Sequence, residues 1–162
     1  GTMERFLGTL RRLVNCYQAF EAYSASHVRA TGLTPAQFDV VATLGNTVGM
    51  TCRELGERTL ITKGTLTGVL DRLEERGLLT RTPCEDNRRS VLVRLTAKGE
   101  ALFASVFPAH VEHLRAAFGT LQSEELDRMD AYLDRLSRHF APSDDRSVTP
   151  KSRLVAAARR NV

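Results

Sequence analysis

Residues 51–99 read TCRELGERTLITKGTLTGVLDRLEERGLLTRTPCEDNRRSVLVRLTAKG and set the architecture of the chain. Segments 51–58 and 62–76 each open on a residue that caps helices well, continue with apolar residues at helical spacing and are joined by a short turn. Two β-favouring runs, 78–81 and 91–95, flank a turn-rich loop, which indicates a β-hairpin. The order helix, turn, helix and hairpin predicts a winged helix-turn-helix, an arrangement that reads DNA.

The second helix of this pattern, 62–76, has two unlike faces. Its apolar residues fall on one face and are expected to be buried, while small, hydroxylic and basic residues occupy much of the rest. Small side chains beside Lys and Arg let a helix approach base edges and phosphates closely. We expect the hairpin tip to add two arginines that reach phosphates or the narrow minor groove. The predicted DNA-binding residues are Thr62, Lys63, Thr65, Thr67, Arg72, Arg88 and Arg89.

The charge of the chain is unevenly distributed. Its 162 residues include 23 Lys+Arg and 19 Asp+Glu, which gives a formal net charge of +4. Basic residues are in excess over 51–99 and 141–162, whereas acidic residues are in excess over 100–140. This division indicates one basic face on an otherwise acidic or neutral body. A winged helix can also bind proteins, but the basic and hydroxylic exposed positions favour double-stranded DNA as the partner.

Long amphipathic segments flank the winged unit. Apolar residues recur every three to four positions from Met3 to about Ala30, and again over 96–118 and 123–140. Pro108 is expected to kink or break the second of these helices. A first helix of roughly 28 residues would be about 42 Å long, too long for a small domain to cover. We therefore expect a second copy of the chain to cover it, in a homodimer.

The expected fold is mainly α with a small β-wing (α+β): a winged helix-turn-helix with long terminal dimerisation helices. Its expected divisions are dimerisation helices at 3–33 and 101–140, a DNA-binding domain at 34–100, and a C-terminal tail with a short basic helix at 141–162. No apolar run approaches the roughly 18 residues that span a bilayer, and no signal pattern is present. We expect a cytoplasmic protein without membrane contact.

Two stretches resemble the MarR family of bacterial winged-helix regulators. They are LDRLEERGLL at 70–79 and NRRSVLVRLTAKG at 87–99, within a resemblance that extends from about Leu7 to Phe140. The resemblance implies an obligate homodimer whose winged domains each meet one half of a pseudo-palindromic operator. It also implies a ligand cleft between the dimerisation helices and the winged domain.

One position of the wing departs from this family. Asn87 stands where the family usually has Asp, with Arg89 at the expected arginine. An Asp there would pair with a neighbouring Arg and stiffen the wing. Either Asp86 substitutes for it, or the wing is looser.

The expected function is a transcriptional regulator, a repressor that leaves its operator when a small-molecule effector occupies the cleft. In a bacterial cell it would be associated with the nucleoid while bound. Arg or His among aromatic residues suits a small aromatic or carboxylate ligand, although the same residues could simply pack the dimer. The candidate effector-binding residues are Tyr17, Tyr23, His27, Arg29 and Phe38.

A redox or metal-responsive switch is the alternative function. Cys16 lies in the middle of the first helix, where some members of the resembled family sense peroxide, but a buried apolar thiol is the simpler interpretation. His110 and His113 share a helix face and are weak metal candidates, although a solvated or interface pair is favoured. No catalytic or phosphate-binding motif occurs, so neither an enzyme nor a bound cofactor is expected.

Overall fold

The structure is a computed structural model that describes residues 2–87 and 89–141, without the side chains of residues 2 and 3. Arg88, a predicted DNA contact, and the predicted tail from residue 142 onward lie outside the described residues. The described elements are α1 (Thr2–Arg29), α2 (Pro35–Leu44), β1 (Met50–Thr51), α3 (Cys52–Arg58), α4 (Lys63–Glu75), β2 (Leu79–Pro83), β3 (Val91–Leu95), α5 (Ala97–Phe118) and α6 (Ser123–Phe140). The predicted fold class, mainly helical with a small sheet, is confirmed.

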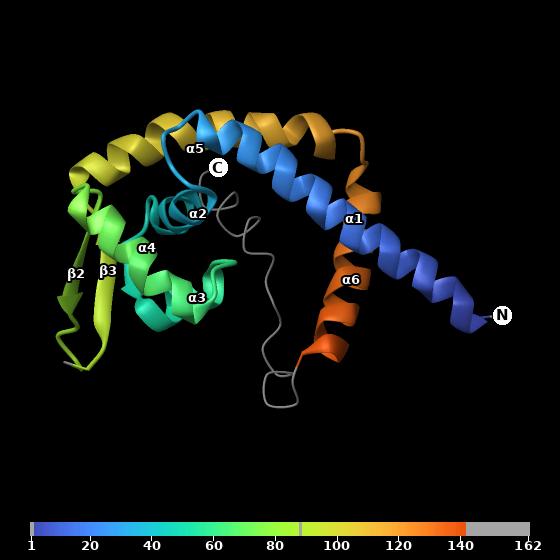
Figure 1. Cartoon of the computed structure of the whole chain (residues 1–162), viewed down its shortest axis with the longest axis horizontal. Helices are drawn as coiled ribbons and strands as arrows, with labels where there is room; N and C mark the ends of the chain where they lie inside the picture. The colour runs from blue at the N-terminus through green and yellow to red at the C-terminus, as the bar shows by residue number, and fades with distance from the viewer. Residues whose placement is uncertain (1, 88, 142–162) are drawn as a thin grey trace.

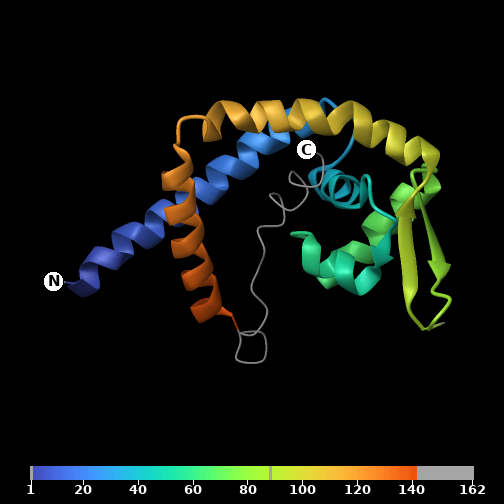
Figure 2. The same ribbon diagram turned by 180° about the vertical axis from the view of Figure 1, so that it is seen from behind.

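Two parts of the chain are visible in Figure 1. Helices α2, α3 and α4 cluster with the sheet, and α5 runs across the top of this cluster beside the end of α1. Helices α1 and α6 extend away from the cluster on its other side, as both views show (Figures 1 and 2). The winged unit is therefore connected to these extended helices through α5 and the last turns of α1.

The wing is a three-stranded antiparallel sheet with the order β1-β3-β2. Strands β2 and β3 pair along their full lengths, which confirms the predicted hairpin. Strand β1 adds an edge, with Met50 opposite Val93. It escapes sequence-based prediction because two residues are too few to show the alternation of a strand.

Threonine side chains cap the N-termini of several helices. At α2 the side chain of Thr34 accepts the N–H of Gln37, while the side-chain oxygen of Gln37 accepts the N–H of Thr34. This capping box supplies partners for donors that a helix start leaves unpaired. Thr51 caps α3 through its side chain, as the sequence pattern predicts, and Thr96 caps α5 in the same way. At α6 the cap is Gln122.

The apolar face of α4 is buried as its spacing predicts. Leu66, Val69, Leu70 and Leu73 are the buried residues of this helix, and they pack against the apolar core shared by α2, α3 and the sheet. Burial of each such side chain contributes about 1.5–3 kcal/mol. The core therefore fixes which face of α4 points outward.

Helix α5 continues through Pro108, so of the kink or break predicted at this residue, the break is wrong. Proline removes one backbone donor and crowds the preceding turn. Phe103, Val106 and Phe107, just before the proline, are buried against the rest of the chain and hold the helix in place. Tertiary packing outweighs the local penalty.

Gly99 lets the start of α5 approach the base of the wing closely. A Cβ atom on Gly99 would overlap the carbonyl oxygen of Leu78, so a side chain here would push α5 away from the wing.

A buried histidine joins α1, α2 and α5. His110 of α5 is 2% exposed, and its Nδ1 atom lies 3.1 Å from Nδ1 of His27 in α1. Phe38 of α2 packs on the same ring with 4.6 Å between the ring centroids. Burial, followed by the nearby imidazoles of His27 and His113, lowers the pKa of His110 to about 4. His110 is therefore neutral at pH 7.

Acidification is expected to destabilise the fold through His110. Its pKa of about 4 in the folded chain lies below the ordinary 6.5 of a histidine, so the unfolded state takes up the proton first as the pH falls. The free energy of unfolding is then unaffected by this group above about pH 6.5 and decreases toward pH 4, by up to about 3 kcal/mol. Urea unfolding at about pH 7.5 and about pH 5, at a single protein concentration, measures the loss.

Two variants separate His110 from other titrating groups. His110→Phe keeps an aromatic ring against Phe38 but does not titrate, so its stability should differ less between the two pH values. His139→Gln, at an exposed position of α6, should behave as the unmodified chain does. An unchanged pH dependence in His110→Phe would contradict the assignment.

Candidate functional site

The polar surface of α4 carries most of the predicted DNA-binding residues. Lys63, Thr65, Thr67 and Arg72 are exposed on this helix, and Thr62 is exposed immediately before it. Within the described residues, the side chain of Thr62 does not accept a backbone N–H of α4, so the expected cap is not formed. The hydroxyl of Thr62 lies instead 3.0 Å from the hydroxyl of Thr65. The surface therefore presents hydroxyl and cationic groups, which suit base edges and phosphates.

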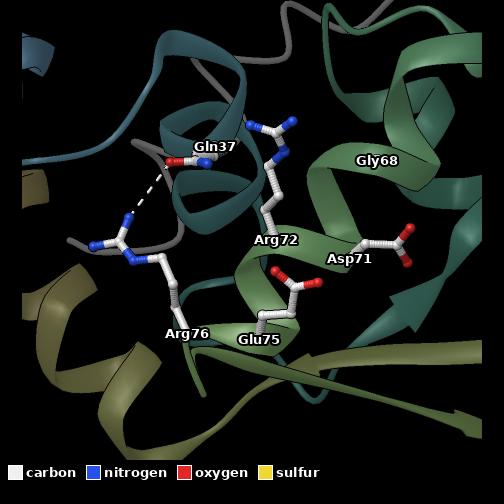
Figure 3. Close-up of a pocket in the computed structure, with 6 residues that line it drawn as sticks. All are labelled: Gln37, Gly68, Asp71, Arg72, Glu75 and Arg76. Carbon is white, nitrogen blue, oxygen red and sulfur yellow. Dashed lines mark hydrogen bonds between the residues drawn. The ribbon is translucent and has the colours of Figure 1, made fainter.

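Helix α2 holds both ends of α4. At the leading end, a carboxylate oxygen of Asp39 accepts the N–H of Leu60, 2.8 Å away, in the turn before α4. At the trailing end, the guanidinium of Arg76 donates to the carbonyl oxygen of Gly32 and to the side-chain oxygen of Gln37, at 3.3 and 3.5 Å (Figure 3). These contacts join residues that are far apart in sequence, so no local pattern predicts them.

The start of α5 holds the trailing end of α4 from a second direction. The hydroxyl of Thr96 donates to the carbonyl oxygen of Gly77 at 2.6 Å, and the ammonium of Lys98 donates to that of Arg76 at 2.9 Å. A cation beside the last carbonyls of a helix is stabilised by the helix dipole. A displacement of α5 would therefore be transmitted to α4.

An open cleft of about 620 Å³ lies over the outer surface of α4, on the side that faces α2 (Figure 3). In Figure 3, Arg72 extends toward Gln37, whereas Asp71 points away from Arg72. The guanidinium groups of Arg72 and Arg76 give this cleft donors for an anion such as phosphate. Its lining residues are Gln37, Gly68, Asp71, Arg72, Glu75 and Arg76.

Arg81 joins strand β2 of the wing to α4. Its Nη2 atom lies 2.6 Å from a carboxylate oxygen of Asp71 and 3.3 Å from one of Glu74. The backbone N–H of Arg81 also donates to Glu74, at 3.1 Å. Hydrogen bonds to Glu74 and then to Asp71 raise the pKa of Arg81 above its ordinary value. This cluster was not found from the sequence, where the acids of α4 show no partner.

Asn87 closes the turn at the tip of the wing. Its side-chain oxygen accepts the N–H of Arg89 at 3.1 Å, and its carbonyl oxygen accepts the N–H of Ser90 at 3.0 Å. The N–H of Cys84 donates to the carbonyl oxygen of Ser90 across the same turn. The side chain of Asn87 thus supplies an acceptor within this turn, and Arg89 is exposed beside it.

Three of the predicted effector-binding residues meet where α1, α2 and α5 converge. Tyr23 stacks on His113 with 3.9 Å between ring centroids, and His27 stacks on the same ring at 4.9 Å. The hydroxyl of Tyr23 donates to the carbonyl oxygen of His113 at 2.6 Å. With Phe38 against His110, these rings form an aromatic and imidazole cluster, named here the histidine junction.

The other two predicted effector residues lie apart from the histidine junction. Tyr17 is exposed and has Phe20 of the same helix as its ring neighbour, with 6.4 Å between centroids. Arg29 is exposed, and its Nε atom donates to the carbonyl oxygen of Ala25 one turn earlier. The structure does not bring Tyr17 and Arg29 to the others.

The expectation that His110 and His113 form a solvated or interface pair is wrong for His110. This side chain is buried inside the chain, and its partner is His27, 83 residues earlier. Helical spacing drew attention to His110 and His113, but only the packing of α1 on α5 pairs His110 with His27. Within residues 2–87 and 89–141, no group of three or more His, Cys, Asp or Glu residues is placed to hold a metal ion.

The cysteines are dispersed over the described chain. Cys16 is exposed on α1, so the expected burial of this thiol is wrong for the single chain. Cys52 is partly buried, and burial raises the pKa of its thiol despite the opposing effect of Arg81. Cys52 is therefore a neutral thiol at pH 7.

No helix of the described chain is both long enough and apolar enough to cross a membrane.

Several known proteins are similar to this chain in sequence and in fold. A model of the MarR family matches residues 33–91. PecS of Dickeya dadantii, an HTH-type transcriptional regulator, is 37% identical over 111 residues, which cover 67% of each chain. BpsR of Bordetella bronchiseptica, whose DNA binding is regulated by 6-hydroxynicotinic acid, has a structure with a TM-score of 0.69 and 30% identity, covering 82% of this chain and 93% of BpsR.

A further structure shows the same fold. Sco3205 of Streptomyces coelicolor, a MarR family transcriptional regulator solved in complex with DNA, has a TM-score of 0.76 and 22% identity, over 85% of this chain and 92% of its own. The relatives are transcriptional regulators, not enzymes. Together with the winged helix-turn-helix and the exposed hydroxylic and basic residues of α4, these similarities show that the chain belongs to the MarR family of DNA-binding transcriptional regulators.

Proposed function

We propose that this regulator is a homodimeric repressor that binds a pseudo-palindromic operator and leaves it when a small aromatic or carboxylate effector binds. The observation that carries the proposal is α4 itself. Its apolar face is buried, its hydroxylic and cationic residues are exposed, and the wing stands beside it. A helix presented in this way enters the major groove in winged helix-turn-helix proteins.

The proposed contacts divide between base reading and phosphate binding. Thr65, Thr67 and Arg72 lie on the exposed surface of α4, where hydroxyl and guanidinium groups can reach base edges. We assign phosphate contacts to Lys63 at the start of α4 and Arg89 at the wing tip, because both side chains are exposed and cationic. Thr62 and Arg88 belong to the proposed set on their sequence positions.

Apolar faces on α1 and α6 support dimerisation with a second copy. These side chains repeat at helical spacing along helices that extend away from the winged unit (Figure 1). Monomeric soluble proteins seldom expose contiguous apolar surface of this extent, and a twofold partner covers the same face on both chains. The large apolar residues exposed on α1 are Phe6, Leu7, Leu10, Leu13, Val14, Tyr17 and Tyr23, and those on α6 are Met129, Tyr132, Leu133, Leu136 and Phe140.

The histidine junction supports a site for the effector. Aromatic rings and imidazole nitrogens are packed together there, and a planar acid that entered between them would find stacking surfaces and hydrogen-bond donors. BpsR, whose DNA binding is regulated by 6-hydroxynicotinic acid, shows that a relative responds to such a compound. A ligand that separated Phe38 from His110 would displace α2, and α2 holds both ends of α4. The spacing of the two recognition helices in the dimer would then change.

Loss of the wing arginine is expected to weaken DNA binding without changing sequence preference. Arg89→Ala should lower affinity for a selected duplex and for random duplex by similar factors, since a phosphate contact carries no base information. The slope of log affinity against log salt should fall by about one. Fluorescence anisotropy over a salt series measures both quantities.

The matched control is Arg115→Ala. Arg115 is an exposed arginine on α5 that pairs with Glu112 within the same helix, so its loss should leave affinity and slope unchanged. Equal affinities for Arg89→Ala and the unmodified protein would overturn the wing contact.

A charge on the apolar face of α6 is expected to disrupt the dimer. Leu133→Glu places a carboxylate in the proposed interface, where its desolvation is unfavourable. The protein should sediment as a monomer and bind the operator weakly. Sedimentation velocity measures the mass.

Ala131→Glu introduces the same charge on the polar side of α6. Ala131 is exposed, and this variant should remain dimeric. If the unmodified chain sediments as a monomer, or Leu133→Glu as a dimer, the proposed interface is wrong.

A small aromatic carboxylate is expected to bind at the histidine junction and release DNA. A panel that includes 6-hydroxynicotinate and benzoate derivatives is titrated into the protein–DNA complex while anisotropy is recorded. An active compound should lose potency by about tenfold or more against His27→Gln, because the variant lacks the ring that faces the ligand. His139→Gln on α6 should retain full response, and an active compound indifferent to His27→Gln would place the effector elsewhere.

A further inference from the structure

Helix α4, the proposed DNA-reading helix, carries a net negative charge, which is unfavourable for binding to DNA. Within α4 there are more acidic residues than basic ones, and the acids lie in its second half. Free carboxylates beside the phosphates of DNA would repel them and oppose docking. The acidic residues are Asp71, Glu74 and Glu75, and the basic ones are Lys63 and Arg72.

Arg81 meets two of these carboxylates at once. One guanidinium nitrogen of Arg81 lies 2.6 Å from Asp71 and 3.3 Å from the nearer oxygen of Glu74, and its Nε atom lies 3.4 Å from the other oxygen of Glu74. The planar fork of arginine suits this arrangement, which the single ammonium of lysine would not reproduce. The Arg81 side chain is 24% exposed, against 51% and 42% for Asp71 and Glu74.

The position of the cluster places it close to the DNA-facing surface. Asp71 lines the open cleft over α4 together with Arg72. In Figure 3 the two side chains diverge, so that Arg72 extends toward α2 and Asp71 toward the opposite side. Arg81 comes from β2, so the neutralising charge is delivered by the wing, and the helix and the wing are joined by the same contact.

We propose that Arg81 is a positioning residue for DNA binding, which acts as a built-in counter-ion for Asp71 and Glu74 so that α4 can approach phosphates. The proposal rests on the proposed contacts of α4 and the wing with DNA. Exposed ion pairs contribute little to folding. Loss of Arg81 should therefore impair DNA binding far more than it lowers the unfolding temperature.

The primary test compares Arg81→Met with the triple variant Arg81→Met/Asp71→Asn/Glu74→Gln. The duplex is the tightest one selected by the unmodified protein from a random pool. Arg81→Met should bind about tenfold or more weakly, because two carboxylates are left unneutralised near phosphates. The triple variant, which removes those charges as well, should recover affinity to within about threefold of the unmodified protein.

Salt provides a second readout that a purely structural defect would not alter. The affinity ratio of unmodified protein to Arg81→Met should shrink as salt rises from about 0.05 to about 0.2 M, since ions screen carboxylate–phosphate repulsion. Thermal unfolding of all the variants by circular dichroism checks that each is folded.

The DNA affinities of Arg81→Met, the triple variant and Arg89→Ala separate this inference from the proposed function. Full affinity in Arg81→Met, or a triple variant as weak as Arg81→Met with a salt-independent deficit, would overturn the counter-ion role. If Arg89→Ala is impaired while Arg81→Met is not, the DNA contacts stand and this inference alone fails. If neither is impaired, the assignment of the wing to DNA fails with it.

Discussion

The attachment of α4 at both of its ends is the constraint on which the rest of the structure depends. The buried leucines decide which face of the helix points outward, but the hydrophobic effect is non-directional and leaves the tilt of the helix to other contacts. The bonds from Asp39 to the leading turn and from Arg76 to Gln37 remove that freedom, and Thr96 and Lys98 add a second support at the trailing end. The outward surface is thereby held in one orientation relative to α2 and α5.

The same contacts connect the reading surface to the rest of the chain. Consecutive residues of α2 face in different directions, since Gln37 and Asp39 bond toward the ends of α4 while Phe38 packs on His110. A short helix with partners on both sides moves as a unit. Helix α2 therefore contacts the histidine junction on one side and the ends of α4 on the other. This arrangement gives a physical route for coupling between the histidine junction and the exposed surface of α4, the reading surface.

Local features were predicted well from the sequence, and long-range ones were not. The cap at Thr51 and the buried face of α4 depend on neighbours within one or two turns. The His27–His110 pair joins residues 83 positions apart, and local periodicity cannot pair them.

The candidate site follows the same division. The exposure of Thr65, Thr67 and Arg72 could be foreseen from helical spacing, because it follows from burial of the opposite face. The partners of Asp71 and Glu74 could not, since Arg81 reaches them only after the wing folds against α4. The persistence of α5 through Pro108 likewise reflects packing that a local propensity does not contain.

The continuity of α5 also limits how the length of this protein can change in evolution. The helix starts at the base of the wing and runs to the turn before α6 without an internal joint. Insertion of a single residue into a helix rotates everything beyond it by about 100° and shifts it by about 1.5 Å. Such a change in α5 would turn the apolar face of α6 away from its present direction relative to the reading surface. Related sequences should therefore vary in length in the turns, while the number of residues between Thr96 and Gly119 stays fixed.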